Sequence, residues 1–405
     1  MPYSMDPNRQ ANGGGHGGAL PPGNDADPGS PRWRCLRPVV FVIYGLLVVA
    51  ATVLVIIDFT EVSKVEKFKR TLALVAFFPM VIAVPIAFWG ILTHMVYFTR
   101  PTLQKYIVRI LWTVPTYVIM TWFALRYPHT KIYLDAVREL YEALAIYNFV
   151  FYISAYFADE VPDLESNLAA KPLQSLPLPL CKIKRQPTLG MVHKCKIGVL
   201  SYVVVRIVAT IFTVVTYLTN NYKDGDLTPS NPYFWVCTLV TVTQILAMFS
   251  LSLLRMATYE ELQPLPRFFK QFVGIHLLIF FTNYQGSIIN LLAKTGVLDP
   301  HDNWGYVDDD PFPFAAMIQE VLICFEMVGL AAFLVYSFEY QRYDTNEPKQ
   351  NIAQICLYMF TVTSLKSSVL DHIKEGGGNN TNEGYQGDPQ SQQPTAGRQA
   401  QSGVV

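Results

Sequence analysis

The chain has 405 residues, of which 51% are hydrophobic and 15% charged, and its 31 Lys and Arg residues balance 31 Asp and Glu residues. This balance indicates no polyanion-binding surface, so we expect no nucleic-acid partner. The 6 cysteines follow neither C-x-x-C nor Cys/His spacing, so we expect no disulfide framework, metal site or cofactor.

Both ends of the chain have a composition typical of disorder. Residues 1–32 and 376–405 are rich in Gly, Pro and Asn and poor in large apolar residues, so we expect neither tail to bury a core. The first apolar run starts only at Val39, after Arg34 and Arg37. A run of about 19 residues suits a membrane-spanning helix better than the core of a signal peptide.

The middle of the chain contains eight apolar segments, each near the roughly 20 residues that a helix needs to cross the hydrocarbon core. The sequence therefore predicts an all-α, polytopic membrane helix bundle over residues 33–345. Pro79 and Pro85 fall inside the second segment and predict a tilt or a kink. The predicted spans are 39–57, 72–98, 107–125, 133–157, 197–219, 233–254, 268–293 and 314–338.

The predicted fourth span combines a charged first half with an apolar second half. Asp135, Arg138, Glu139 and Glu142 are spaced i, i+3, i+4 and i+7, so a helix places all of them on one face. Either this face lines the mouth of an internal cavity, or the charged half lies at the membrane interface and the chain has seven spans. The second alternative would put the two termini on opposite sides of the membrane.

The distribution of Lys and Arg predicts the orientation of the chain. With both termini in the cytosol, most basic residues near the span ends fall on the cytosolic side, although the basic stretch 64–70 does not. The loop 158–196 is then cytosolic.

Residues 346–375 carry apolar side chains every three or four positions, which predicts an amphipathic helix on the membrane or on the bundle.

Several polar side chains fall inside the predicted spans, where a charge is either paired or functional. Asn283, Ser287 and Asn290 share one face of the seventh span, either as hydrogen-bonding contacts to other helices or as a cavity wall. The charged residues likewise form either structural ion pairs or a polar path in which Arg206 meets an anionic substrate. The candidate solute path comprises Glu142, Asn148, Tyr152, Arg206, Gln285, Glu320 and Glu326.

The sequence lacks the common motifs of hydrolases and metalloenzymes. Neither G-x-S-x-G nor H-E-x-x-H occurs, so we expect no enzyme. Cysteines near the span ends on the predicted cytosolic side are candidates for palmitoylation, and the alternative for each is an unmodified thiol. These candidates are Cys35, Cys181, Cys195 and Cys356.

Five stretches carry a family pattern: LRPVVFVIYGLL, THMVYFTRPTLQKYIVRILWTVPTY, LDAVRELYEALAIYNF, CKIGVLSYVVVRIVAT and LICFEMVGLAAF. Together they resemble the organic solute transporter alpha family, and most of all its transmembrane-protein-184 branch. The similarity covers about residues 33–345, which is nearly all of the predicted membrane region.

This resemblance implies a seven-helix core, preceded here by one extra N-terminal helix. It also implies facilitated diffusion of amphipathic organic anions, such as steroid conjugates and bile acids, together with a small single-span partner subunit or a homo-oligomer. Members nearer to this sequence are linked to signalling and to vacuolar or endosomal membranes, and bind cytosolic partners through the C-terminal region. The resemblance thus implies either an endomembrane of the vacuole or endosome type, or the plasma membrane. The alternative function is therefore an endomembrane adaptor that recruits a cytosolic partner.

The resemblance also singles out individual positions and two departures. Ile207 stands where the family has a proline after the arginine, so a proline kink is missing. Cys181 is alone where the family often has a run of cysteines, which weakens the case for lipidation. The residues that fall on the family's motifs are Tyr141, Glu142, Tyr147, Asn148, Arg206, Gln285 and Glu326.

Overall fold

The structure is a computed structural model that describes residues 31–60, 64–177, 180–222, 228–297 and 314–343. The chain divides into two units, residues 1–359 and 360–405, and every described residue belongs to the first. The predicted amphipathic helix 346–375 and, except for residues 31–32, the predicted disordered tails lie outside the described residues.

In the part of the chain that the structure describes, 8 helical segments are long and apolar enough to cross a membrane. This finding confirms the predicted all-α polytopic bundle. The fourth segment, α5, is one continuous helix through both its charged and its apolar half. The segments are built from α1 (Pro31–Thr60), α2 (Lys64–Val96), α3 (Pro101–Leu111) with α4 (Thr113–Arg126), α5 (Lys131–Glu160), α7 (Leu189–Leu218), α8 (Pro232–Ala257), α10 (Phe268–Ile279) with α11 (Gln285–Lys294), and α12 (Phe314–Ser337).

Two of these described segments are interrupted. The helix breaks at Trp112, between α3 and α4, because Pro115 has no N–H to donate to the carbonyl four residues earlier. A π-helical turn, η2 (Phe280–Tyr284), separates α10 from α11, and such turns are frequent at functional sites. Pro79 and Pro85, by contrast, lie within the uninterrupted helix α2.

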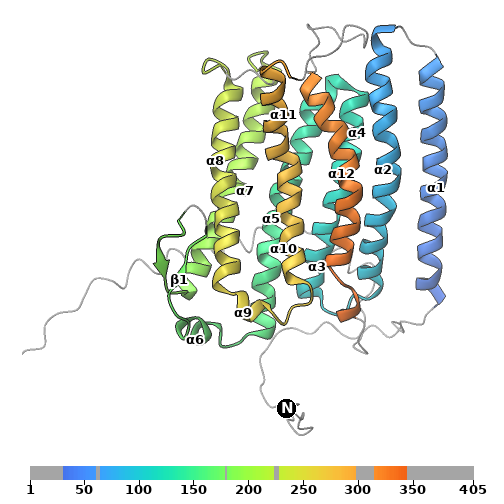
Figure 1. Cartoon of the computed structure of the whole chain (residues 1–405). Helices are drawn as coiled ribbons and strands as arrows, with labels where there is room; N and C mark the ends of the chain where they lie inside the picture. Colours follow the sequence, from blue (N-terminus) through green and yellow to red (C-terminus); the bar gives the residue numbers. More distant parts are fainter. Residues whose placement is uncertain (1–30, 61–63, 178–179, 223–227, 298–313, 344–405) are drawn as a thin grey trace, which may run out of the picture. The chain divides into compact units, whose positions relative to one another are not determined.

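The helices lie side by side (Figure 1). Helix α12 packs along α2 and α4, α5 packs against α3, α4 and α7, and α7 packs closely with α8. Helix α1 packs mainly on α2, where the Tyr44 hydroxyl donates to the Val81 carbonyl at 2.9 Å. Large apolar side chains such as Val42 and Leu46 are exposed on the outer helices, as expected for surfaces that contact lipid.

Side-chain caps fix where α7 and α8 begin. The Thr188 hydroxyl accepts from the Met191 N–H at 3.2 Å, and the Asn231 side chain accepts from the Tyr233 N–H at 3.1 Å. Pro232 follows at the first position of α8, where its missing N–H costs no helical hydrogen bond. These caps set the register of two helices that carry cavity residues.

Short elements connect the long helices. Strand β1 (Gln174–Ser175) pairs antiparallel with β2 (Lys184–Arg185). Lys171 ties this connection to the end of α8, because its ammonium donates to the Ala257 carbonyl at 2.9 Å and to Glu261 at 2.5 Å. The remaining short elements are η1 (Pro128–Thr130), α6 (Leu164–Ala169), α9 (Tyr259–Leu262) and η4 (Gln341–Tyr343).

Aromatic side chains fill the interior near the C-terminal ends of α5 and α12. The Phe149 ring lies 6.0 Å from the Phe272 ring and 6.5 Å from the Phe338 ring. The Tyr152 ring lies 6.0 Å from Phe338, and Phe149 and Tyr152 are fully buried. This half of the bundle is therefore closely packed, whereas the opposite half is polar.

Candidate functional site

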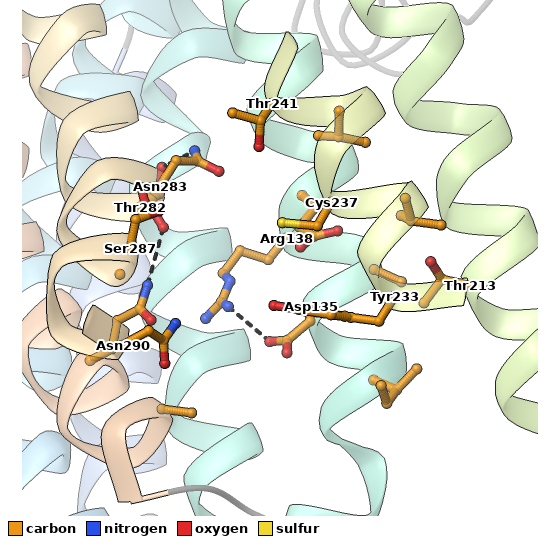
Figure 2. A pocket seen from close by; sticks show the side chains of 18 of the residues that line it. Asp135, Arg138, Thr213, Tyr233, Cys237, Thr241, Thr282, Asn283, Ser287 and Asn290 are labelled. Atoms are coloured by element: carbon orange, nitrogen blue, oxygen red, sulfur yellow. Dashed lines mark hydrogen bonds and ion pairs between the residues drawn. The ribbon is translucent and has the colours of Figure 1, made fainter. Parts of the chain in front are cut away.

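A cavity of about 590 Å³ occupies the polar half of the bundle. It is lined by the first part of α5, the second part of α7, the first part of α8, η2 with α11, and the start of α12. Figure 2 shows Ser287 and Asn290 on one side of this space, Thr213 and Tyr233 on the other, and Arg138 between them. Its wall combines charges, hydroxyls and amides with apolar residues.

One wall of the cavity is a chain of buried charges. The Lys131 ammonium lies 2.6 Å from Asp135, and the Arg138 guanidinium lies 2.9 Å from the same carboxylate. Arg138 is also ion-paired with Glu320 of α12 and donates to the Thr121 hydroxyl at 3.0 Å. Arg138 is therefore held on several sides by groups that are themselves buried.

Arg206 of α7 lies on another part of the wall, and its ion-pair partner among the described residues is partly exposed. Arg206 itself is 6% exposed, and its Nη1 lies 3.2 Å from Oε2 of Glu139. Its Nε is buried without a hydrogen-bond partner. The Glu139 side chain is 41% exposed, so the partner of this buried cation remains accessible.

The Glu142 carboxylate lies directly behind the lining and joins three other segments. It accepts from the Tyr117 hydroxyl of α4 at 2.6 Å, from the Gln244 amide of α8 at 2.9 Å, from the Thr282 hydroxyl at 3.1 Å and from the Asn283 amide at 2.6 Å. Both donors from the seventh segment lie in the π-helical turn η2. Glu142 itself is only 1% exposed, so it organises the cavity wall without facing the cavity.

The cavity brings together only some of the residues that the sequence singled out. Arg206 and Glu320 line it, and so do Asn283, Ser287 and Asn290. The polar face of the seventh span therefore lines the cavity, as one of the two predictions had it. Asn283 also fits the alternative, a hydrogen-bonding contact to another helix, because it donates to Glu142 of α5.

Besides Glu142, four of the predicted residues do not line the cavity. Asn148 donates to the Leu144 carbonyl of its own helix at 2.7 Å, and Tyr152 lies in the aromatic half. Gln285 donates to Glu326 at 2.6 Å, and neither of them lines the cavity. These residues make contacts within the bundle, and their place on a solute path stays a prediction.

The lipidation candidates differ in accessibility. Cys181 is exposed and Cys195 is buried, and burial of the Cys195 thiol opposes its acylation in this fold. Cys35 lies in α1, and Cys356 lies outside the described residues. Lipidation of any of these four cysteines stays a prediction.

Three contacts of the candidate site escaped sequence reasoning. Glu139 was visible as part of the charged stripe, but its pairing with Arg206, 67 residues away, has no local signal. Tyr117 and Thr282 were also missed as partners of Glu142, because single hydroxyls are common inside membrane helices and do not stand out by type or spacing.

Comparison with known families agrees with this architecture. The model of the family described as Organic solute transporter Ostalpha matches residues 72–343, which is roughly two thirds of the chain. The chain belongs to this family. The match to the Ostalpha family runs from α2 to η4 and includes every residue that lines the cavity. No solved structure matches the chain significantly.

Membership of the Ostalpha family confirms the family that the sequence motifs indicated. The protein is therefore a multi-pass membrane protein of a solute transporter family, as the apolar outer surface of its helices requires. The assignment to the transmembrane-protein-184 branch stays a prediction. Helix α1 precedes the matched segment, in agreement with the expected extra N-terminal helix.

Proposed function

We propose that this Ostalpha family member moves an amphipathic organic anion through its helix bundle and binds the anionic group at Arg206. The observation that carries this proposal is a buried arginine with an unpaired Nε on the wall of a cavity of about 590 Å³. Binding sites for small organic molecules commonly have volumes of about 300–1,000 Å³. The cavity is thus large enough for a steroid-sized solute.

The chemistry of Arg206 suits a carboxylate or a sulfate. A guanidinium offers five N–H donors in a planar fork and forms short, charge-assisted hydrogen bonds with anionic oxygens. Apolar lining residues such as Val236, Val240 and Ile245 would contact the hydrocarbon body of the solute. An amphipathic anion therefore matches the combination of groups on the wall better than a small inorganic ion does.

Transport requires a second state of the bundle, because aromatic rings fill the half beyond Glu142. We propose that α7 and α8 move together, since they pack extensively on each other and α7 packs on α5. The resemblance to facilitated carriers supports downhill movement in both directions. With both termini in the cytosol, this cavity opens toward the opposite side of the membrane.

The test is uptake of a radiolabelled steroid 3-sulfate into liposomes that contain the purified protein, alone and with a single-span partner subunit. Arg206→Gln should lower uptake about tenfold or more, because a charge-assisted contact worth about 1.5–3 kcal/mol is lost. Arg185→Gln is the matched control, since Arg185 is exposed on the β2 strand. Absence of uptake by the unaltered protein in both preparations would refute transport of this class of solute. Unchanged uptake by folded Arg206→Gln would make Arg206 structural.

A further inference from the structure

Two buried arginines line the cavity, and they differ in the groups that pair with them. Arg138 is paired with Asp135 and Glu320, whose side chains are 15% and 4% exposed, and it also donates to Thr121. Arg206 has Glu139 as its ion-pair partner among the described residues, and one of its donors is unpaired. Arg138 is held by two carboxylates and a hydroxyl, whereas Arg206 has a buried donor without a hydrogen-bond partner.

Glu139 is the carboxylate that can leave its partner at the lowest cost. Its side chain is 41% exposed and lines the cavity, so water can solvate it after separation. Because water reaches its carboxylate, this pair contributes less than a fully buried pair does. Separation of Glu320 from Arg138, by contrast, would leave two charges buried, which is strongly unfavourable.

We propose that Glu139 occupies the anion position on Arg206 in the empty cavity and is displaced by the anionic group of the solute. This inference rests on the proposed function and adds a residue that sets affinity and selectivity. A neutral amphiphile cannot replace Glu139 as the ion-pair partner of Arg206, so its binding is not favoured by displacing Glu139. The internal carboxylate thereby discriminates against uncharged molecules of the same shape.

The displaced carboxylate also favours release of the solute. After displacement, Glu139 and the bound anion lie near the same guanidinium, and like charges repel. When the solute leaves, Glu139 restores the ion pair, so Arg206 is never left without a counter-charge. A carrier that works in both directions needs such moderate affinity, because very tight binding would slow the departure of the solute.

The experiment measures equilibrium binding of a radiolabelled steroid 3-sulfate to the full-length protein in nanodiscs, with the uncharged parent steroid as a competitor. Glu139→Gln keeps the size of the side chain and an oxygen acceptor for Arg206 but removes the competing charge. We expect about fivefold tighter binding of the sulfate, the equivalent of losing a weak, half-exposed ion pair, and no change for the parent steroid. Glu165→Gln, an exposed carboxylate on α6, is the control and should leave both affinities unchanged.

A second variant shows whether the gain depends on Arg206. In the Arg206→Gln background, which has no cation for Glu139 to occupy, Glu139→Gln should give less than half of its effect on sulfate binding. If the sulfate binds but Glu139→Gln leaves its affinity unchanged or weaker, the competitor role is refuted while the proposed function stands. If neither the unaltered protein nor Glu139→Gln binds the sulfate, the proposed function fails and this inference fails with it.

Discussion

Arg138 and Glu320 are separated by 182 residues in the sequence and form a buried ion pair that joins α5 to α12. The pair extends through Asp135 to Lys131, so a run of alternating charges crosses the polar half of the bundle. The ion pair thereby joins two helices of the cavity wall, of which α12 also packs on α2 and α4.

Removal of Glu320 should be strongly destabilising. In Glu320→Ala, Arg138 keeps Asp135, which it shares with Lys131, and the buried network holds an excess positive charge. We expect a loss of about 3 kcal/mol in the free energy of unfolding, measured by thermal and denaturant unfolding in detergent. Replacing both partners, Arg138→Met with Glu320→Leu, should recover part of the loss. A Glu320→Ala variant as stable as the unaltered protein would contradict this account.

Substitutions of Glu142 should separate the role of its charge from that of its hydrogen bonds. Glu142→Gln keeps the shape, and the hydroxyls and amides around it can reorient to match an amide. Glu142→Ala leaves the side chains of Tyr117, Gln244, Thr282 and Asn283 without this acceptor, and each unsatisfied group costs about 1–3 kcal/mol. In the same unfolding assay, the alanine variant should lose about 3 kcal/mol or more and the glutamine variant less than half of that. Equal losses would argue against reorientation of the donors.

The close packing of α7 on α8 depends on Gly198. A Cβ atom added there would lie 2.3 Å from Oγ and 3.2 Å from Cβ of Ser250, so Gly198→Ala should cost about 1–3 kcal/mol of stability. Ser250→Ala removes the nearer atom and should restore part of the stability in the double variant. Gly45→Ala is the control, because its added Cβ meets no atom within 4 Å. If Ser250→Ala does not restore stability to Gly198→Ala, the clash with Ser250 is not the cause of the loss.

Native cysteines provide a direct test of the cavity and of the orientation. Cys237 is exposed on the cavity wall and Cys181 is exposed near β2, whereas Cys195 and Cys324 are buried. In single-cysteine variants, a membrane-impermeant thiol reagent should label Cys237 from the non-cytosolic side and Cys181 from the cytosolic side. Buried Cys324 should react only after denaturation. Labelling of Cys237 and Cys181 from the same side would overturn the proposed topology.

The spans were predictable because the thickness of the bilayer fixes how many apolar residues a helix must present. The charged face of α5 was predictable for a related reason, since α-helical spacing alone puts Asp135, Arg138 and Glu139 on one side. Membrane helices turn such a face inward, away from lipid, and the structure shows these residues on the cavity wall.

The pairings between helices could not be predicted, because they depend on how each helix is rotated against its neighbours. Arg206 and Glu326 both fall in apolar segments, yet Arg206 pairs with Glu139 and Glu326 bonds to Gln285. The π-helical turn added a further obstacle. It accommodates an extra residue in one turn, so a helical projection at 100° per residue misplaces side chains before it relative to those after it.

The charges along the cavity wall also determine how a solute first reaches it. Among the described lining residues, Lys131, Arg138 and Arg206 are balanced by Asp135, Glu139 and Glu320. Opposite charges this close cancel beyond a Debye length, about 8 Å at physiological salt, so the mouth attracts anions weakly from a distance. Capture should then proceed by ordinary diffusion, with an association rate that changes little with ionic strength, unlike that of a funnel lined by one sign of charge. Solutes should then differ mainly in how fast they dissociate from the cavity wall, and less in how fast they reach it.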